Sequence, residues 1–119
     1  MKNASFIVLL LTLASCYSIP EIENFDIETW KKDARTCEDT RIKLAQTLIA
    51  QSDKLLGEGE AEIKGLLGKP SEHELYNRNQ KFFYYNLHEE NCPDAKRLSI
   101  KFDALDRAKE VRIISWRNK

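Results

Sequence analysis

The spacing of apolar residues divides the chain into an apolar N-terminal run, a helical region and a region of alternating strands. Across residues 39–56 apolar side chains recur every three or four positions, which predicts an amphipathic helix. Residues 59–68 repeat this pattern over a shorter length. Gly68 suits the left-handed position that follows a helix, and Pro70 prevents the helix from continuing. The sequence therefore predicts two helices in this region.

From residue 74 onward apolar and polar side chains alternate, which is typical of β-strands. The expected strands are 74–76, 81–87, 98–102 and 110–116, with a polar turn at 77–80 and a polar loop at 88–96. Helices that precede strands in this way favour the α+β class. We therefore expect two N-terminal helices packed on one face of a three- to four-stranded antiparallel meander.

The first fifteen residues have the pattern of a secretory signal. Lys2 precedes an apolar run over residues 6–14, which is too short to cross a bilayer as a helix. The run ends in Leu13-Ala14-Ser15-Cys16, which resembles a bacterial lipobox. In a lipobox the cysteine thiol receives a diacylglycerol, and a peptidase that requires small residues before the cysteine then cuts there. The alternative is an ordinary signal that leaves Cys16 as a free thiol.

This interpretation divides the chain into a signal peptide at 1–15, a lipidated tether at 16–24 and one domain at 25–119. Lipidated Cys16 would anchor the domain to a membrane through its acyl chains, because each buried methylene adds about 0.8 kcal/mol. Tyr17 stands where enteric bacteria place an inner-membrane retention signal, which favours the outer membrane. Anchoring in the inner membrane remains an alternative. Within the domain, Trp30 is expected to dock on the core from a short helix or turn.

Composition narrows the range of partners. The chain has 119 residues with 19 basic and 19 acidic side chains, so net charge supplies no attraction to nucleic acid. Loss of Lys2 with the signal leaves 18 basic side chains against 19 acidic ones. One domain is the natural number for this length.

Two cysteines remain when Cys16 is lipidated. Cys37 and Cys92 lie in a compartment that permits disulfides, so we expect them to pair and to close a loop of 55 residues. The chain-entropy model assigns such a bridge about 4 kcal/mol. The alternative is two reduced thiols.

Few residues suggest other chemistry. His73 and His88 each stand beside glutamates, but strand alternation and the expected hairpin separate them, so we expect solvated charges and no metal site. No nucleophile motif and no isolated carboxylate pair appears. We therefore expect a protein that is not an enzyme, with no cofactor and no small-molecule substrate.

The aromatic strand around residues 82–85 suggests a binding surface. Alternation sends Phe82 and Tyr84 to one face and Phe83 and Tyr85 to the other. One face must pack on the helices, and exposed aromatic residues on the other would mark an interaction surface. We take Tyr76, Phe83 and Tyr85 as the candidate protein-binding set, although alternation alone does not say which face is exposed.

Several local motifs resemble the BamE (SmpA/OmlA) family of small lipoproteins. Residues 62–70, EIKGLLGKP, resemble the family's helix that ends in Leu-Gly-x-Pro, and the aromatic strand FFYY at 82–85 resembles the strand that follows it. LSIKFD at 98–103, followed by Glu110-Val111, resembles the family's next hairpin. The resemblance covers residues 58–115 and implies a helix-plus-meander fold. The N-terminal segment 25–56 and the cysteine pair depart from the family.

The resemblance implies a non-enzymatic, lipid-anchored protein on the periplasmic face of the outer membrane. It would bind a protein partner in the envelope as an accessory or scaffold, as BamE proteins do in the assembly of outer-membrane β-barrels. One alternative is an inhibitor-like binding module for another periplasmic protein, because β-lactamase-inhibitor-like modules share the Leu-Gly-x-Pro pattern. The other is a small ligand-binding or enzymatic lipoprotein.

Overall fold

The computed structural model describes residues 18–32, 36–75 and 80–116, and it has the α+β fold expected from the sequence. The helices come first: α1 (Ile27–Lys32), α2 (Thr40–Ala50), a 3₁₀ turn η2 (Ser52–Lys54) and α3 (Glu60–Leu67). Four strands follow: β1 (Glu72–Leu75), β2 (Lys81–Asn86), β3 (Lys96–Phe102) and β4 (Ala108–Ser115). The expected helices and meander are both present, and α1 adds a short third helix. Within the described residues no helix is long and apolar enough to cross a membrane.

Helix α3 follows its sequence signals closely. Gly59 lies just before it in an extended conformation, and Gly68 follows it with a φ of 83°, in the left-handed region that favours glycine. The amide N–H of Gly68 donates to the Lys64 carbonyl oxygen at 2.8 Å, which closes the last turn. Gly57, in contrast, ends no helix. Its N–H donates to the Ala108 carbonyl oxygen at 2.8 Å and ties the start of α3 to β4.

Helix α2 ends at Ala50, six residues before the apolar periodicity predicts. The cause is a pairing between side chain and backbone across the fold. The Gln51 side-chain oxygen accepts from the Glu23 N–H at 2.9 Å, and its amide nitrogen donates to the Glu23 carbonyl oxygen at 2.8 Å. Gln51 leaves the helical conformation, and η2 then turns fully buried Leu55 into the core. The contact also shows that the folded part begins before residue 25, because Ile22 belongs to the core.

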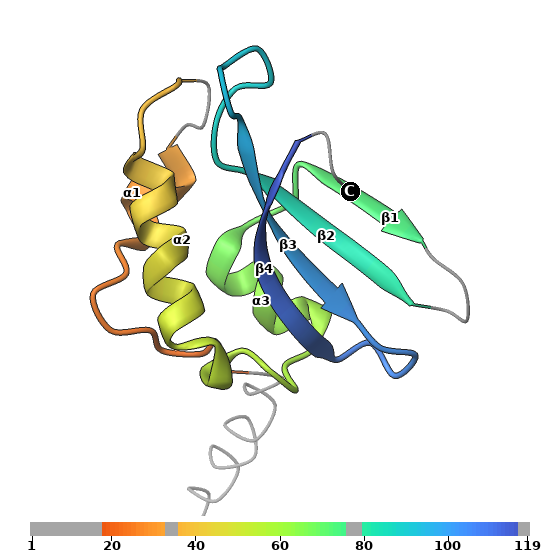
Figure 1. The fold of residues 1–119 in the computed structure, drawn as a ribbon. Helices are drawn as coiled ribbons and strands as arrows, with labels where there is room; N and C mark the ends of the chain where they lie inside the picture. The colour runs from red at the N-terminus through yellow and green to blue at the C-terminus, as the bar shows by residue number, and fades with distance from the viewer. Residues whose placement is uncertain (1–17, 33–35, 76–79, 117–119) are drawn as a thin grey trace, which may run out of the picture.

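The sheet is an antiparallel meander in the order β1-β2-β3-β4. Its register aligns Phe83, Ile100 and Val111 across three strands on one face. Strand β1 begins at Glu72, two residues earlier than predicted, and places His73 opposite Phe83. Figure 1 shows α3 behind the strands, with α1 and α2 side by side near the β4 edge. All three helices therefore pack against the same face of the sheet.

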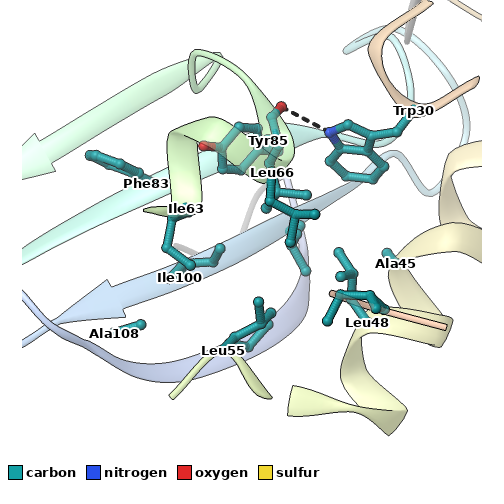
Figure 2. Packing of buried hydrophobic residues seen from close by; sticks show 14 of the residues in the cluster. Trp30, Ala45, Leu48, Leu55, Ile63, Leu66, Phe83, Tyr85, Ile100 and Ala108 are labelled. Atoms are coloured by element: carbon teal, nitrogen blue, oxygen red, sulfur yellow. Dashed lines mark hydrogen bonds between the residues drawn. The ribbon is translucent and has the colours of Figure 1, made fainter. Parts of the chain in front are cut away.

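The core lies between the helices and this inner face (Figure 2). Trp30 is its largest buried side chain, with no exposed surface, and its indole Nε1–H donates to the Leu67 carbonyl oxygen at 3.0 Å. The expected docking of Trp30 is thus confirmed. The Arg41 guanidinium lies 4.2 Å from the Trp30 ring centroid and donates to the carbonyl oxygens of Trp30 and Asn86. Arg41 therefore ties the start of α2 to α1 and to the end of β2.

Candidate functional site

The face of the sheet opposite the helices, called the outer face from here on, carries a mixture of aromatic and charged side chains. Because the strands pair in register, every second residue of each strand lies on it. Its members are Glu72, Glu74, Phe82, Tyr84, Asn86, Arg97, Ser99, Lys101, Glu110, Arg112, Ile114 and, just beyond β4, Trp116.

Arg97 contacts three other side chains of the outer face. Its guanidinium carbon lies 4.4 Å from the Tyr84 ring centroid and 4.3 Å from the Trp116 ring centroid, so both rings stack on the cation. Its Nη2 donates to Glu72 Oε1 at 2.7 Å. The side chain is only 1% exposed, although it belongs to the face that the helices leave uncovered. Two aromatic rings and one carboxylate thus enclose the cation.

The stack of rings continues along β2. The Phe82 and Tyr84 rings are parallel, with centroids 5.9 Å apart, and Lys101 Nζ lies 5.9 Å from the Phe82 centroid. The Tyr84 hydroxyl donates to Glu74 Oε1 at 2.9 Å. Burial, followed by the hydrogen bond to Glu74, raises the pKa of Tyr84 to about 12. Neutral Tyr84 is therefore part of this surface at physiological pH.

A partner would meet the outer members of this stack. Phe82, Lys101, Ile114 and Trp116 are half-buried, and Arg112 is exposed. Aromatic and arginine side chains are enriched in the cores of protein interfaces because they combine apolar area with directional polar contacts. The outer face therefore has the composition of a protein-binding surface, held in place by its own ring and cation contacts.

The position of Arg97 is costly for stability. Within the described residues its Nε and Nη1 are buried and have no hydrogen-bond acceptor. A buried donor left unpaired costs about 1–3 kcal/mol. Removing one partner of an ion pair is costly when the other stays buried, but the Glu72 side chain is 43% exposed and can be solvated without Arg97. Stability alone therefore gives little reason for an arginine at this place, and recognition of a partner gives one.

Replacing Arg97 by methionine should leave the free energy of unfolding unchanged or raise it by about 1–3 kcal/mol, because methionine fills the space between the rings without a charge. Replacing Arg97 by alanine should lower it by about 2–5 kcal/mol, because a cavity remains. Urea unfolding followed by circular dichroism measures both changes. A large loss in the methionine variant would show that Arg97 is there for stability.

The raised pKa of Tyr84 predicts a loss of stability in alkaline solution. The pKa of Tyr84 in the folded protein lies above the ordinary value of 10.0. Neutral Tyr84 therefore contributes fully to the free energy of unfolding below pH 10.0, and this contribution disappears as the pH rises toward about 12. Urea midpoints should therefore fall between about pH 10 and about pH 12. The Tyr84→Phe variant should show a shallower fall, with the remainder coming from Tyr85, whose pKa burial also raises. Equal slopes in the two proteins would contradict this assignment.

The structure corrects the predicted aromatic set. Phe83 and Tyr85 are 2% and 1% exposed and face the helices, so they belong to the core and not to a binding surface. The aromatic residues of the outer face are instead Phe82 and Tyr84, together with Trp116. Tyr76 lies outside the described residues, as do Cys16 and the residues that precede it.

The expected disulfide is confirmed. Cys37 and Cys92 are bonded, with their Cα atoms 5.5 Å apart. The bridge joins the segment before α2 to the loop between β2 and β3, where the Glu89 N–H also donates to the Thr36 carbonyl oxygen at 3.1 Å. It therefore fastens the helical layer to the β2–β3 end of the sheet, close to Trp116, which lines the same surface pocket as Cys92.

The histidines have structural contacts. His88 is 5% exposed; its Nδ1 accepts the Lys96 N–H at 3.1 Å, and its Nε2 lies 3.0 Å from Asp39 Oδ1. His73 stacks edge-on against Phe83 with ring centroids 6.1 Å apart. No group of three or more histidine, cysteine or acidic side chains suited to a metal occurs among the described residues.

Sequence reasoning missed Arg97 and Trp116. The sequence pattern assigns no role to Arg97 and places Trp116 only at the end of the predicted strand 110–116. One signal was available, because alternation in β3 puts Arg97 on the face opposite Leu98 and Ile100. Its burial depends on Trp116, which follows β4 and lies far from Arg97 in the sequence, so no local pattern brings the two together.

Comparison with known proteins gives one weak structural similarity and no match by sequence. No family model matches the chain, and no curated protein matches it. A solved structure described as "Putative Osmotically inducible lipoprotein OsmE characterization by Xray crystallography" aligns with a TM-score of 0.42 and 16% sequence identity. The alignment covers 50% of this chain and 68% of that chain. A similarity of this size assigns no function, and the α+β fold rests on the helices and sheet described above.

Proposed function

We propose that this protein is a lipid-anchored, non-enzymatic binding protein that faces the periplasm from the outer membrane and holds an envelope protein on the outer face of its sheet. The observation that supports the proposal is the outer-face stack of Tyr84, Arg97 and Trp116. Aromatic residues with a buried, incompletely paired arginine are a composition that favours recognition over stability. The lipobox that ends at Cys16 supports the membrane anchor.

The surface is tested by crosslinking in intact cells. A photoreactive phenylalanine analogue replaces Phe82 on the outer face, and in a matched control it replaces Lys43, which is exposed on α2. Both variants carry the full chain and are illuminated in a bacterial host. We expect a discrete crosslinked protein from position 82 and none from position 43. Identical products from both positions, or no product from position 82, would contradict the proposed surface.

The identity of the crosslinked protein separates the two binding functions. A component of the β-barrel assembly machinery would indicate an accessory of that assembly. A single soluble periplasmic enzyme would indicate an inhibitor-like module, which is the second candidate suggested by the sequence. The Arg97→Met change provides a further check, because it should remove the crosslink at position 82 while leaving the fold intact.

The anchor is tested separately. Cys16→Ala removes the thiol that would carry the diacylglycerol, so the protein should lose that modification, and mass spectrometry of the purified wild-type protein should show acyl chains on Cys16. An unmodified Cys16 in the wild-type protein would rule out the lipid anchor. The crosslinking result would still test the binding surface, because it does not depend on the anchor.

A further inference from the structure

The residues that precede α1 form an apolar groove with one side of α3. Its volume is about 410 Å³, and it is lined by one carboxylate and six apolar residues: Glu21, Ile19, Pro20, Ile22, Phe25, Ile27 and Leu66. Ile19 is 47% exposed, and it lies beside other apolar residues of the same groove, so it is part of a continuous surface and not a single exposed side chain. Figure 1 shows this segment as the red-orange loop that runs beside α2. The groove is thus an open surface at the N-terminal end of the domain, formed mainly by apolar residues with Glu21 among them.

Chain length restricts where this groove can lie in an anchored protein. Three residue steps separate Cys16 from Ile19, and a fully extended chain covers at most about 11 Å in three steps. The headgroup layer of a bilayer is roughly 5–8 Å thick on each side. A diacylglycerol on Cys16 holds that residue at the inner edge of this layer. Ile19 therefore lies within roughly 6 Å of the headgroups, whatever path the tether takes.

We propose that this groove is the surface by which the domain contacts the phospholipid bilayer, with Ile19 and the groove lining seated at the boundary between headgroups and acyl chains. The inference rests on the proposed lipidation of Cys16. Burial of apolar side chains about 5–10 Å into this boundary lowers their free energy. The short tether already holds them close to the bilayer, so the contact loses little additional translational entropy. The bilayer then covers the groove, and the contact restricts how the domain is oriented on the membrane.

Charge indicates which bilayers fit. The described segment 18–32 carries more carboxylates than lysines: Glu21, Glu23, Asp26, Glu28, Lys31 and Lys32. The carboxylate of Asp26 stays ionised, because hydrogen bonds from Thr29 lower its pKa. Anionic headgroups therefore do not attract this end of the domain. The contact is apolar, and zwitterionic lipids suit it best.

The test uses tryptophan as a depth reporter in the full chain, expressed in a bacterial host and purified from its membranes. Ile19→Trp places the reporter at the groove. Leu105→Trp places it at an exposed leucine in the β3–β4 turn. Each protein is reconstituted into phosphatidylcholine vesicles with and without brominated acyl chains. After subtraction of the wild-type signal, which comes from Trp30 and Trp116, we expect roughly twofold stronger quenching for Ile19→Trp than for Leu105→Trp, since bromine quenches only groups near the acyl chains.

The outcomes separate the inference from the proposed function. Mass spectrometry first establishes whether Cys16 of each protein carries acyl chains; if it does not, the anchor and the contact both fall. If Cys16 is acylated and the two reporters are quenched equally, the anchor stands and the groove contact is wrong. Replacing part of the phosphatidylcholine by phosphatidylglycerol should not increase the quenching of Ile19→Trp. An increase would show that charge, and not the apolar groove, drives the contact.

Discussion

Removing the Cys37–Cys92 bridge should lower the free energy of unfolding by about 4 kcal/mol, which is the chain-entropy value for a closed loop of 55 residues. Without the bridge the unfolded chain gains conformations, while the folded state keeps the Glu89–Thr36 hydrogen bond and the His88–Asp39 contact. The total free energy of unfolding of a small domain is only about 5–15 kcal/mol. Loss of the bridge would therefore leave a protein near the limit of stability.

The measurement compares urea unfolding of three proteins: oxidised wild type, reduced wild type, and the Cys37→Ser/Cys92→Ser double variant. The reduced protein and the double variant should unfold at similar, much lower urea concentrations. Their m-values should be larger than that of the oxidised protein, because the unfolded chain without a crosslink exposes more surface. A difference in stability below about 1 kcal/mol would mean that the unfolded chain is already compact around this loop.

Local signals predicted the elements that local chemistry controls. Gly59 and Gly68 bound α3 within a residue of its observed ends, and Pro70 follows two residues after Gly68, because a left-handed glycine and a proline stop a helix regardless of its surroundings. Period-two alternation predicted the meander in the same way. The end of α2 could not be predicted from local sequence, because Gln51 leaves the helix to form hydrogen bonds with Glu23, which lies 28 residues away in the chain.

The exposed face of the sheet was mispredicted for a specific reason. All four residues from 82 to 85 are aromatic, so β2 shows no contrast between its two faces. The contrast lies in β3, where Leu98 and Ile100 alternate with Arg97 and Ser99. Antiparallel register places Phe83 opposite Ile100 and so assigns it to the core. The face of an all-aromatic strand is therefore decided by its neighbour, through a register that a single sequence does not reveal.

Replacing Trp30 by alanine should lower the free energy of unfolding by about 3–5 kcal/mol. Trp30 has no exposed surface, and its indole N–H donates to the Leu67 carbonyl oxygen. Its ring centroid lies 5.6 Å from that of Phe25 and 6.1 Å from that of Tyr85, so Trp30 joins three parts of the fold. Alanine leaves a cavity between α1, α3 and β2, and it leaves the Leu67 carbonyl without its donor.

Two further variants separate these causes. Trp30→Phe keeps much of the ring volume and loses the hydrogen bond, so it should cost about 1–3 kcal/mol. Trp116→Ala removes the same type of side chain from a half-buried position on the outer face, so it should lower the free energy of unfolding less than Trp30→Ala does. Urea unfolding followed by circular dichroism ranks the three. If Trp30→Ala costs no more than Trp116→Ala, α1 is not an integral part of the core and the contact of Trp30 with α3 contributes little to the fold.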